Sequence, residues 1–173
     1  MKTKKTTTKK QVKNEWISFK KSKIHSTGGF AAKNIPKGTR IIEYVGNLIT
    51  KKEAEKIADR EIARHKRNSK NGAVYLFDLN KKYDIDGNVP WNPAKNINHS
   101  CNPNAEFDIK KERVWIVAIK NIKKGEEIAY DYGYDIENWQ DHPCKCGSKN
   151  CVGYIVSSDD WYKLGKKLKK PEI

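Results

Sequence analysis

Short stretches in which apolar and polar residues alternate run through most of the chain, a pattern typical of half-buried β-strands. Strands are predicted near Ile17 and Phe19 and at 30–32, 40–45, 74–79, 83–86, 107–109, 114–119 and 128–132. Turns are predicted at 26–29, 35–38, 110–112 and Gly125, where glycine, proline or charged residues interrupt the alternation. Many short strands in succession indicate a mainly β domain.

Two segments instead repeat apolar residues at helical spacing. Thr50 and Glu53 form a capping box ahead of the first segment, which continues to Ile62. The second segment runs to the last residues of the chain and begins at Ser157 or Ser158, either of which is a suitable N-cap. The fold class expected from these patterns is mainly β (α+β), with few short helices.

The formal net charge of +15 is concentrated at the two ends of the chain. Residues 1–23 hold nine lysines against one glutamate, and residues 163–173 hold five lysines against one glutamate. Such ends attract polyanions, so binding of nucleic acid through the basic tails is one expectation. The alternative is a solvated end without a partner, and residues 1–14 are predicted to be a disordered basic arm.

The apolar stretches are all short. None approaches the ~18 consecutive apolar residues of a membrane helix. No apolar run follows the first lysines, as it would in a secretory signal. We therefore expect an intracellular protein with no membrane association, in which cysteines are normally reduced.

A C-x-C-x4-C cluster lies in a glycine-containing loop at 144–151. In an intracellular chain, four cysteines favour a metal site over disulfides. Three thiolates do not close a tetrahedral structural zinc site, so a fourth ligand is required. Cys101 is the remaining cysteine, while His142 is a rival ligand and His99 a weaker one.

Two further segments carry candidate chemistry: residues 98–104 read N-H-S-C-N-P-N, and residues 127–132 read E-I-A-Y-D-Y. Taken alone, an Asn-His pair is usually part of a turn, and tyrosines two apart on a strand usually belong to a core. Together with the cysteine cluster, however, they resemble the two signatures and the post-SET zinc segment of the SET-domain methyltransferases. Segments 24–31 and 35–46 are similar to earlier parts of that family, and the resemblance covers roughly residues 15–156.

The resemblance implies a fold and a division of the chain. The fold is a SET-domain β-clip of several small sheets, with few short helices and a knot-like C-terminal crossing. The division is a disordered basic arm at 1–14, a SET domain at 15–135, a post-SET zinc segment at 136–156, and a C-terminal amphipathic helix and basic tail at 157–173. The implied ligands of a structural zinc are Cys101, Cys144, Cys146 and Cys151.

The resemblance also implies that the chain is a protein-lysine N-methyltransferase that uses S-adenosylmethionine. Tyr132 matches the catalytic tyrosine, and Tyr75 matches an aromatic residue that lines the lysine channel. Tyr130 occupies the position where Tyr or Phe biases the product, and Tyr there is similar to enzymes that stop at one or two methyl groups. The residues that match cofactor contacts are Thr27, Gly28, Gly29, Asn98, His99 and Tyr154.

The expected partners are a protein substrate with an exposed lysine, such as a histone or another DNA-associated protein, and nucleic acid bound non-specifically by the tails. The expected location is the nucleus, on chromatin, or a bacterial cytoplasm. A second hypothesis is a zinc-containing, nucleic-acid-tethered binding or scaffold module without catalysis. The nearly balanced charge between the two tails argues against a nucleic-acid binder, and the presence of Tyr132, Asn98 and His99 argues against a module without catalysis.

Overall fold

A computed structural model describes residues 14–67 and 74–169. Apart from Asn14, the predicted basic arm at 1–14 lies outside the described residues, as do 170–173 of the predicted tail. The described residues form two compact units, and each is considered by itself. The first unit contains residues 42–67, 74–95 and 108–116, and the second contains 14–41, 96–107 and 117–169.

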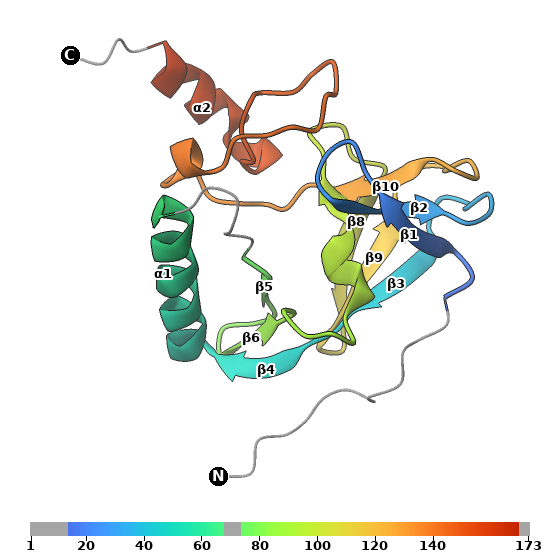
Figure 1. Ribbon diagram of the computed structural model, residues 1–173, viewed down its shortest axis with the longest axis horizontal. Coiled ribbons are helices and arrows are strands. Elements are labelled where there is room, and N and C mark those ends of the chain that lie inside the picture. The colour runs from blue at the N-terminus through green and yellow to red at the C-terminus, as the bar shows by residue number, and fades with distance from the viewer. Residues whose placement is uncertain (1–13, 68–73, 170–173) are drawn as a thin grey trace. The chain divides into compact units, whose positions relative to one another are not determined.

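Ten short strands and a few helices make up the described residues, as the alternating pattern predicted (Figure 1). The strands are β1 (Ile17–Lys21), β2 (Thr27–Ala31), β3 (Arg40–Tyr44), β4 (Asn47–Thr50), β5 (Leu76–Asp78), β6 (Tyr83–Asp86), β7 (Asn98–His99), β8 (Ala105–Lys110), β9 (Arg113–Ala118) and β10 (Glu127–Tyr130). The α-helices are α1 (Lys51–Arg67) and α2 (Trp161–Leu168), and the 3₁₀ helices are η1 (Pro93–Asn96), η2 (Trp139–Asp141) and η3 (Ser158–Asp160). This confirms a mainly β fold of several small sheets with few short helices. Among the described residues, no helix is long and apolar enough to cross a membrane.

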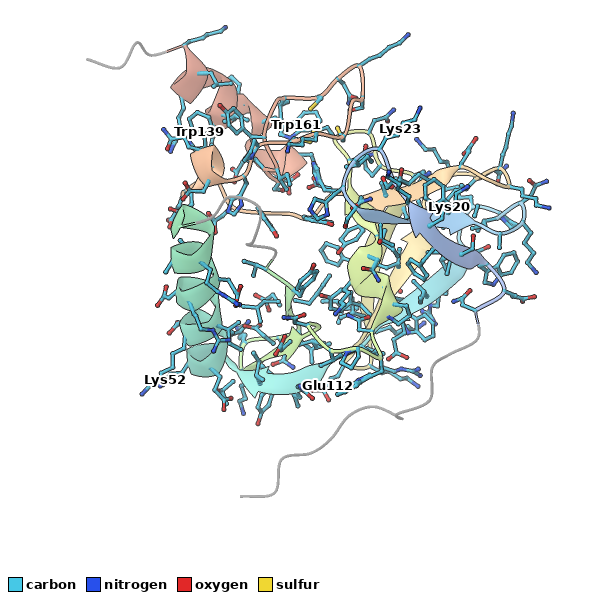
Figure 2. All side chains as sticks on the ribbon, in the orientation of Figure 1. Lys20, Lys23, Lys52, Glu112, Trp139 and Trp161 are labelled. Atoms are coloured by element: carbon cyan, nitrogen blue, oxygen red, sulfur yellow. The ribbon has the colours of Figure 1, made fainter. Side chains whose placement is uncertain are left out.

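The first unit is built on a three-stranded sheet of order β4-β6-β5. The predicted capping box precedes α1: the Glu53 carboxylate accepts hydrogen bonds from the Thr50 backbone N–H and hydroxyl, both at 2.8 Å. Figure 2 shows Lys52 at this first turn of the helix. Strand β4 was not predicted, because its four residues follow a glycine and run directly into the helix.

The second unit is built on a four-stranded sheet of order β1-β2-β10-β7, of which Figure 1 labels β1, β2 and β10. Strand β2 is antiparallel to both β1 and β10, whereas β7 and β10 are parallel. A parallel pair needs a long crossover connection, and here that connection is the chain from 100 to 126. The core of this unit includes the fully buried side chains of Ile35, Ile97, Ile122 and Ile128.

A third sheet has the order β3-β9-β8, and each of its strands has residues in both units. The predicted hairpin turn connects β8 to β9 at Lys111 and Glu112, which have φ angles of 52° and 57°. Figure 2 marks this turn by Glu112. Two consecutive positive φ angles match a two-residue hairpin turn, which normally selects asparagine and glycine.

Two local predictions were wrong. The turn expected at 26–29 lies earlier, at 22–26, where the Ser22 N–H donates to the Ser26 carbonyl at 3.1 Å. Thr27, Gly28 and Gly29 belong to β2, because this strand pairs with β1 along its whole length. The strand expected at 128–132 ends at Tyr130, where its pairing with β7 ends, so Tyr132 lies just beyond it.

Candidate functional site

The two signature segments meet in the second unit through the pairing of β7 with β10. In this register Asn98 lies opposite Ala129, and His99 lies opposite Tyr130. Both β7 residues are buried, with exposed fractions of 6% for Asn98 and 3% for His99. The fold therefore brings the predicted Asn-His pair next to Tyr130 and close to the point where the chain leaves β10 towards Tyr132.

The orientation of the Asn98 amide follows from its two neighbours. Its Nδ2 donates to the Thr27 carbonyl at 3.2 Å and to a Glu127 carboxylate oxygen at 2.7 Å. Both neighbours are acceptors, so only the NH₂ side of the amide can face them. Asn98 Oδ1 consequently points elsewhere, and this buried acceptor has no hydrogen-bond partner in the part of the chain that the structure describes.

Gly28 lies against the same cluster. A Cβ atom added to Gly28 would clash with the Glu127 carboxylate and lie 2.9 Å from Ser22 Cβ and 3.0 Å from Asn98 Nδ2. The Ser22 hydroxyl donates to the same Glu127 oxygen at 2.7 Å. Glycine is required at this position for space, because the backbone of β2 passes directly beneath these polar side chains.

Tyr132 lies in a group of aromatic rings just after β10. Its phenol donates to the Ile97 carbonyl at 2.9 Å. Its ring centroid is 5.0 Å from that of Tyr130, 5.4 Å from that of His99 and 5.7 Å from that of Tyr134. Tyr130 is buried. The two predicted tyrosines are therefore neighbours although only one of them belongs to the strand.

His99 contacts two other site residues through opposite sides of its ring. The Tyr132 backbone N–H donates to Nδ1 at 3.2 Å, and Nε2 lies 3.5 Å from the Cys101 sulfur. Burial lowers the pKa of His99, and the nearby Asp131 carboxylate offsets only part of this effect. The ring is therefore neutral near pH 7.

The four cysteines form one cluster. Their Sγ atoms all lie within 4.8 Å of one another, and Cys101 Sγ is 3.8 Å from both Cys144 and Cys151 Sγ. Four thiolates about 2.3 Å from a tetrahedral zinc ion lie roughly 3.8 Å apart, so the observed arrangement fits zinc. Neither His142 nor His99 belongs to the group of metal-ligating atoms found among the described residues. The His142 ring instead packs against Tyr134, with centroids 4.8 Å apart.

The cysteine environments also suit a cation. Burial raises the pKa of the Cys101 thiol to about 11. Burial acts in the same direction on Cys146, but hydrogen bonds from Ser148 and from the backbone outweigh it and lower the pKa of Cys146 to about 6. A buried thiol with a raised pKa becomes a thiolate near pH 7 when a metal ion compensates its charge.

Tyr154 follows the last cysteine and packs edge-to-face on Trp139, with ring centroids 4.4 Å apart and planes at 88°. Figure 2 places Trp139 on the segment that leads into the cysteine loop. Residues Pro143 and Tyr154 form a β-bridge that closes this loop. Tyr154 therefore presents a half-buried aromatic ring whose orientation Trp139 constrains.

Tyr75 belongs to the first unit. Its carbonyl accepts hydrogen bonds from the Tyr44 hydroxyl at 2.9 Å and from the Gly87 N–H at 2.8 Å. The Lys95 ammonium lies over the Tyr75 ring, 5.5 Å from the centroid. Burial raises the pKa of the Tyr75 phenol, so this hydroxyl stays protonated at neutral pH.

Three residues of the site were not predicted from the sequence. Ser22 and Trp139 carry no signal in a single sequence that separates them from other loop residues. Glu127 is the first residue of the second signature segment, and this position was the only indication in the sequence that it belongs to the site. Its role becomes visible only with the contacts to Ser22 and Asn98, since both partners are distant in the sequence.

Comparison with known proteins agrees with these features. The family model described as "SET domain" matches residues 27–133. The chain is 38% identical over 151 residues to the histone-lysine N-methyltransferase trr of Drosophila melanogaster, covering 82% of this chain and 6% of that protein. It is 35% identical over 153 residues to histone-lysine N-methyltransferase 2D of Homo sapiens, covering 82% of this chain and 3% of that protein.

A similar match is found in a fungal protein. The chain is 34% identical over 149 residues to the H3 lysine-4 specific histone-lysine N-methyltransferase of Schizosaccharomyces pombe, covering 84% of this chain and 16% of that protein. The chain thus corresponds to a small part of the length of each of these relatives. Because the family match extends over more than half of the chain and includes both signature segments, the chain belongs to the SET-domain family.

Proposed function

We propose that this chain is a protein-lysine N-methyltransferase that transfers a methyl group from S-adenosylmethionine to a lysine side chain. The observation that carries the proposal is the parallel pairing of β7 with β10 in a SET-family chain. This pairing brings Asn98 and His99 next to Tyr130 and Tyr132. These residues are the ones that match the family's cofactor contacts and its catalytic tyrosine.

The proposed cofactor contacts are Thr27, Gly28, Gly29, Asn98, His99 and Tyr154. The buried Oδ1 of Asn98 supports this assignment, because a buried acceptor without a partner suits an N–H donor such as the ammonium group of S-adenosylmethionine. The His99 ring is engaged by Tyr132 and Cys101. We therefore assign His99 a cofactor contact through its backbone.

When bound, S-adenosylmethionine supplies an electrophilic methyl group on a sulfonium sulfur. The chain's own residues must align the lysine nitrogen with that methyl and keep water away. A lysine ammonium has a pKa near ~10.4 in water and cannot attack while protonated. Desolvation between aromatic side chains lowers this pKa, and we assign that role to Tyr130, Tyr132 and Tyr75. The Tyr132 hydroxyl orients the incoming amine.

The zinc ion is proposed to be structural. Four cysteine ligands saturate a tetrahedral ion, so no coordination position remains for water or substrate. The proposed ligands, Cys101, Cys144, Cys146 and Cys151, connect the proposed post-SET segment at 136–156 to the proposed SET domain at 15–135.

The proposed substrate is a histone or a similar DNA-associated protein. The support comes from the relatives, which are named as histone-lysine N-methyltransferases. We also propose that the lysines at the two ends of the chain bind nucleic acid non-specifically, and that the protein acts at chromatin. Removing residues 1–13 should then lower activity on DNA-bound histones but leave activity on free histones unchanged.

The experiment that tests the proposed function compares the wild-type protein with Tyr132→Phe. Radiolabelled methyl transfer from S-adenosylmethionine to mixed histones should occur with the wild type and fall by at least tenfold in the variant. Tyr162→Phe is the matched control, because Tyr162 is 75% exposed on α2 and its hydroxyl should have no effect on methyl transfer. If the folded, zinc-loaded wild type transfers no label, a non-catalytic binding or scaffold module becomes the better explanation.

A further inference from the structure

We propose that the His99 side chain is a positioning residue that connects the zinc site to the active site. In this arrangement Nε2–H donates to the Cys101 thiolate, and Nδ1 accepts from the backbone N–H of Tyr132. These two hydrogen bonds together form the His99 bridge. The assignment of Tyr132 as catalytic rests on the proposed function, whereas the bridge itself does not.

The first argument is geometric. Tyr132 N lies 3.2 Å from Nδ1, and Cys101 Sγ lies 3.5 Å from Nε2. The second distance is within the range of a hydrogen bond to sulfur, whose radius exceeds that of oxygen. The ring is only 3% exposed, so water has little access to either nitrogen.

The second argument concerns which ring nitrogen carries a proton. A backbone N–H can only donate, so Nδ1 must offer its lone pair to Tyr132. The ring proton therefore lies on Nε2, where it faces sulfur. A zinc-bound cysteine is a thiolate and accepts such a hydrogen bond. The two neighbours of the ring thus select the same tautomer.

The carboxylate of Asp131 does not oppose this assignment. Its nearer oxygen is 3.7 Å from Nδ1, which is too far for a hydrogen bond. That oxygen accepts from the Gly133 N–H at 3.0 Å, and the other accepts from the Ser158 N–H at 2.9 Å. Both carboxylate oxygens therefore have backbone donors, and neither draws the ring proton to Nδ1.

The consequence is a physical connection between the metal and the proposed catalytic residue. The Cys101 thiolate holds the His99 ring, and the ring in turn holds the backbone of Tyr132. The Tyr132 phenol is held separately, through its hydrogen bond to the Ile97 carbonyl at 2.9 Å. If zinc leaves, Cys101 is no longer fixed and the buried Nε2–H loses its acceptor, which is unfavourable. Zinc therefore contributes to the position of Tyr132 without touching it.

Two substitutions divide the bridge into its halves. An asparagine carbonyl reproduces the position of Nδ1, and a glutamine amide reproduces that of Nε2. His99→Asn keeps an acceptor for Tyr132 and loses the donor to Cys101. His99→Gln keeps that donor and loses the acceptor. His25→Asn is the matched control, because His25 is an exposed histidine of the same unit.

Zinc affinity is measured by competition with a chromogenic chelator. We expect His99→Asn to bind zinc about 10- to 100-fold more weakly, the usual effect of removing a hydrogen bond to a metal ligand. His99→Gln and the control should bind zinc nearly as tightly as the wild type. Equal zinc affinity for His99→Asn and the control would overturn the proposal.

The wild-type protein provides a second readout that does not depend on any variant folding. Nitrogen NMR of the His99 ring should show the proton on Nε2, and a coupling across the hydrogen bond should connect Nδ1 with the Tyr132 amide. Replacement of zinc by NMR-active cadmium should reveal a coupling from the metal, through Cys101, to the Nε2 proton. A proton on Nδ1 would overturn the bridge.

These results separate the bridge from the proposed function. If the NMR couplings are present and the zinc affinities change as expected, but no methyl transfer occurs, the bridge stands and the proposed function fails. If methyl transfer depends on Tyr132 but the ring proton lies on Nδ1, the proposed function stands and the bridge fails.

Discussion

At the scale of single residues, Glu127 holds together three parts of the candidate cofactor site. One carboxylate oxygen accepts from the Ser22 hydroxyl and from the Asn98 amide, both at 2.7 Å. The same oxygen lies directly above Gly28. Because the Asn98 amide can face both Glu127 and the Thr27 carbonyl only with its NH₂ group, these two acceptors together determine where Asn98 Oδ1 points.

Replacement of Glu127 by glutamine should therefore weaken cofactor binding. A glutamine lacks the charge of the carboxylate, so it holds the Asn98 NH₂ group more weakly and leaves the Thr27 carbonyl as the main acceptor that fixes the Asn98 amide. Hydrogen bonds to charged groups contribute about 1.5–3 kcal/mol, so we expect the Kd for S-adenosylmethionine to rise roughly tenfold or more. Calorimetric titration measures the Kd, and Glu126→Gln is the control because Glu126 is the exposed neighbour. Equal Kd values for the two variants would contradict this prediction.

Tyr130 is expected to limit the number of methyl groups. Its ring is buried 5.0 Å from that of Tyr132, so its hydroxyl can hold water where a second or third methyl group would need room. Tyr130→Phe should shift the product from mono- and dimethyl-lysine towards trimethyl-lysine, as measured by mass spectrometry of a modified peptide. Tyr162→Phe is the control, because Tyr162 is 75% exposed on α2, and it should leave the product distribution unchanged. Mainly trimethyl-lysine from the wild type would refute this role.

At the scale of elements, the turn between β8 and β9 shows a mismatch between sequence and backbone. Lys111 and Glu112 both have positive φ angles, which are unfavourable for residues with long side chains by roughly 1–2 kcal/mol each. Asparagine and glycine are the residues that such a turn prefers. Nothing else in this hairpin depends strongly on the two side chains, since the bond from Asn80 to Glu112 is exposed and 3.4 Å long.

The double substitution Lys111→Asn and Glu112→Gly should stabilise the protein by about 1 kcal/mol, because the backbone strain that it relieves exceeds the conformational entropy that the new glycine loses on folding. The free energy of unfolding is measured by urea denaturation. The control is Lys81→Asn with Lys82→Gly, at two residues where neither φ angle is positive. This control should not raise the free energy of unfolding. A gain of equal size at both places would mean that the effect does not come from the turn.

The elements also show what a single sequence reveals and what it does not. The capping box and the hairpin turn were predicted correctly, because each depends on residues close together in the sequence. The C-x-C-x4-C part of the cysteine cluster is local as well, whereas Cys101 lies far from it in the sequence and was assigned to the cluster through the family resemblance. The place of Thr27–Gly29 was predicted wrongly, because β2 is defined by pairing with β1 and β10 rather than by its own residues. For the same reason, the contacts of Glu127 and the position of Tyr132 beyond β10 were not predictable.

At the scale of the whole molecule, the residues from Asp131 to Ile155 contain no fully buried side chain. This segment therefore has little hydrophobic stabilisation of its own. The contacts that hold it include the cysteine cluster, the Pro143–Tyr154 bridge and the contact of Trp139 with Tyr154. We therefore expect the proposed zinc ion to contribute to the folding of this segment.

Removal of zinc with a chelator should therefore unfold this segment before the rest of the second unit. Hydrogen exchange should show loss of protection at residues 134–155, while β1 and β2, which pair along five residues, stay protected. Addition of zinc should restore the protection. Unchanged exchange at 134–155 after complete removal of the metal would contradict a structural role for zinc.

The central position of β10 has a consequence for the order of events during synthesis. Strand β10 lies between β2 and β7, yet it is made roughly a hundred residues after β2. While the ribosome adds those residues, the inner edge of β2 has no partner from its own sheet, and an unpaired strand edge invites association with other chains. We therefore expect a nascent chain halted before residue 127 to bind chaperones, and one extended past residue 130 to be released from them.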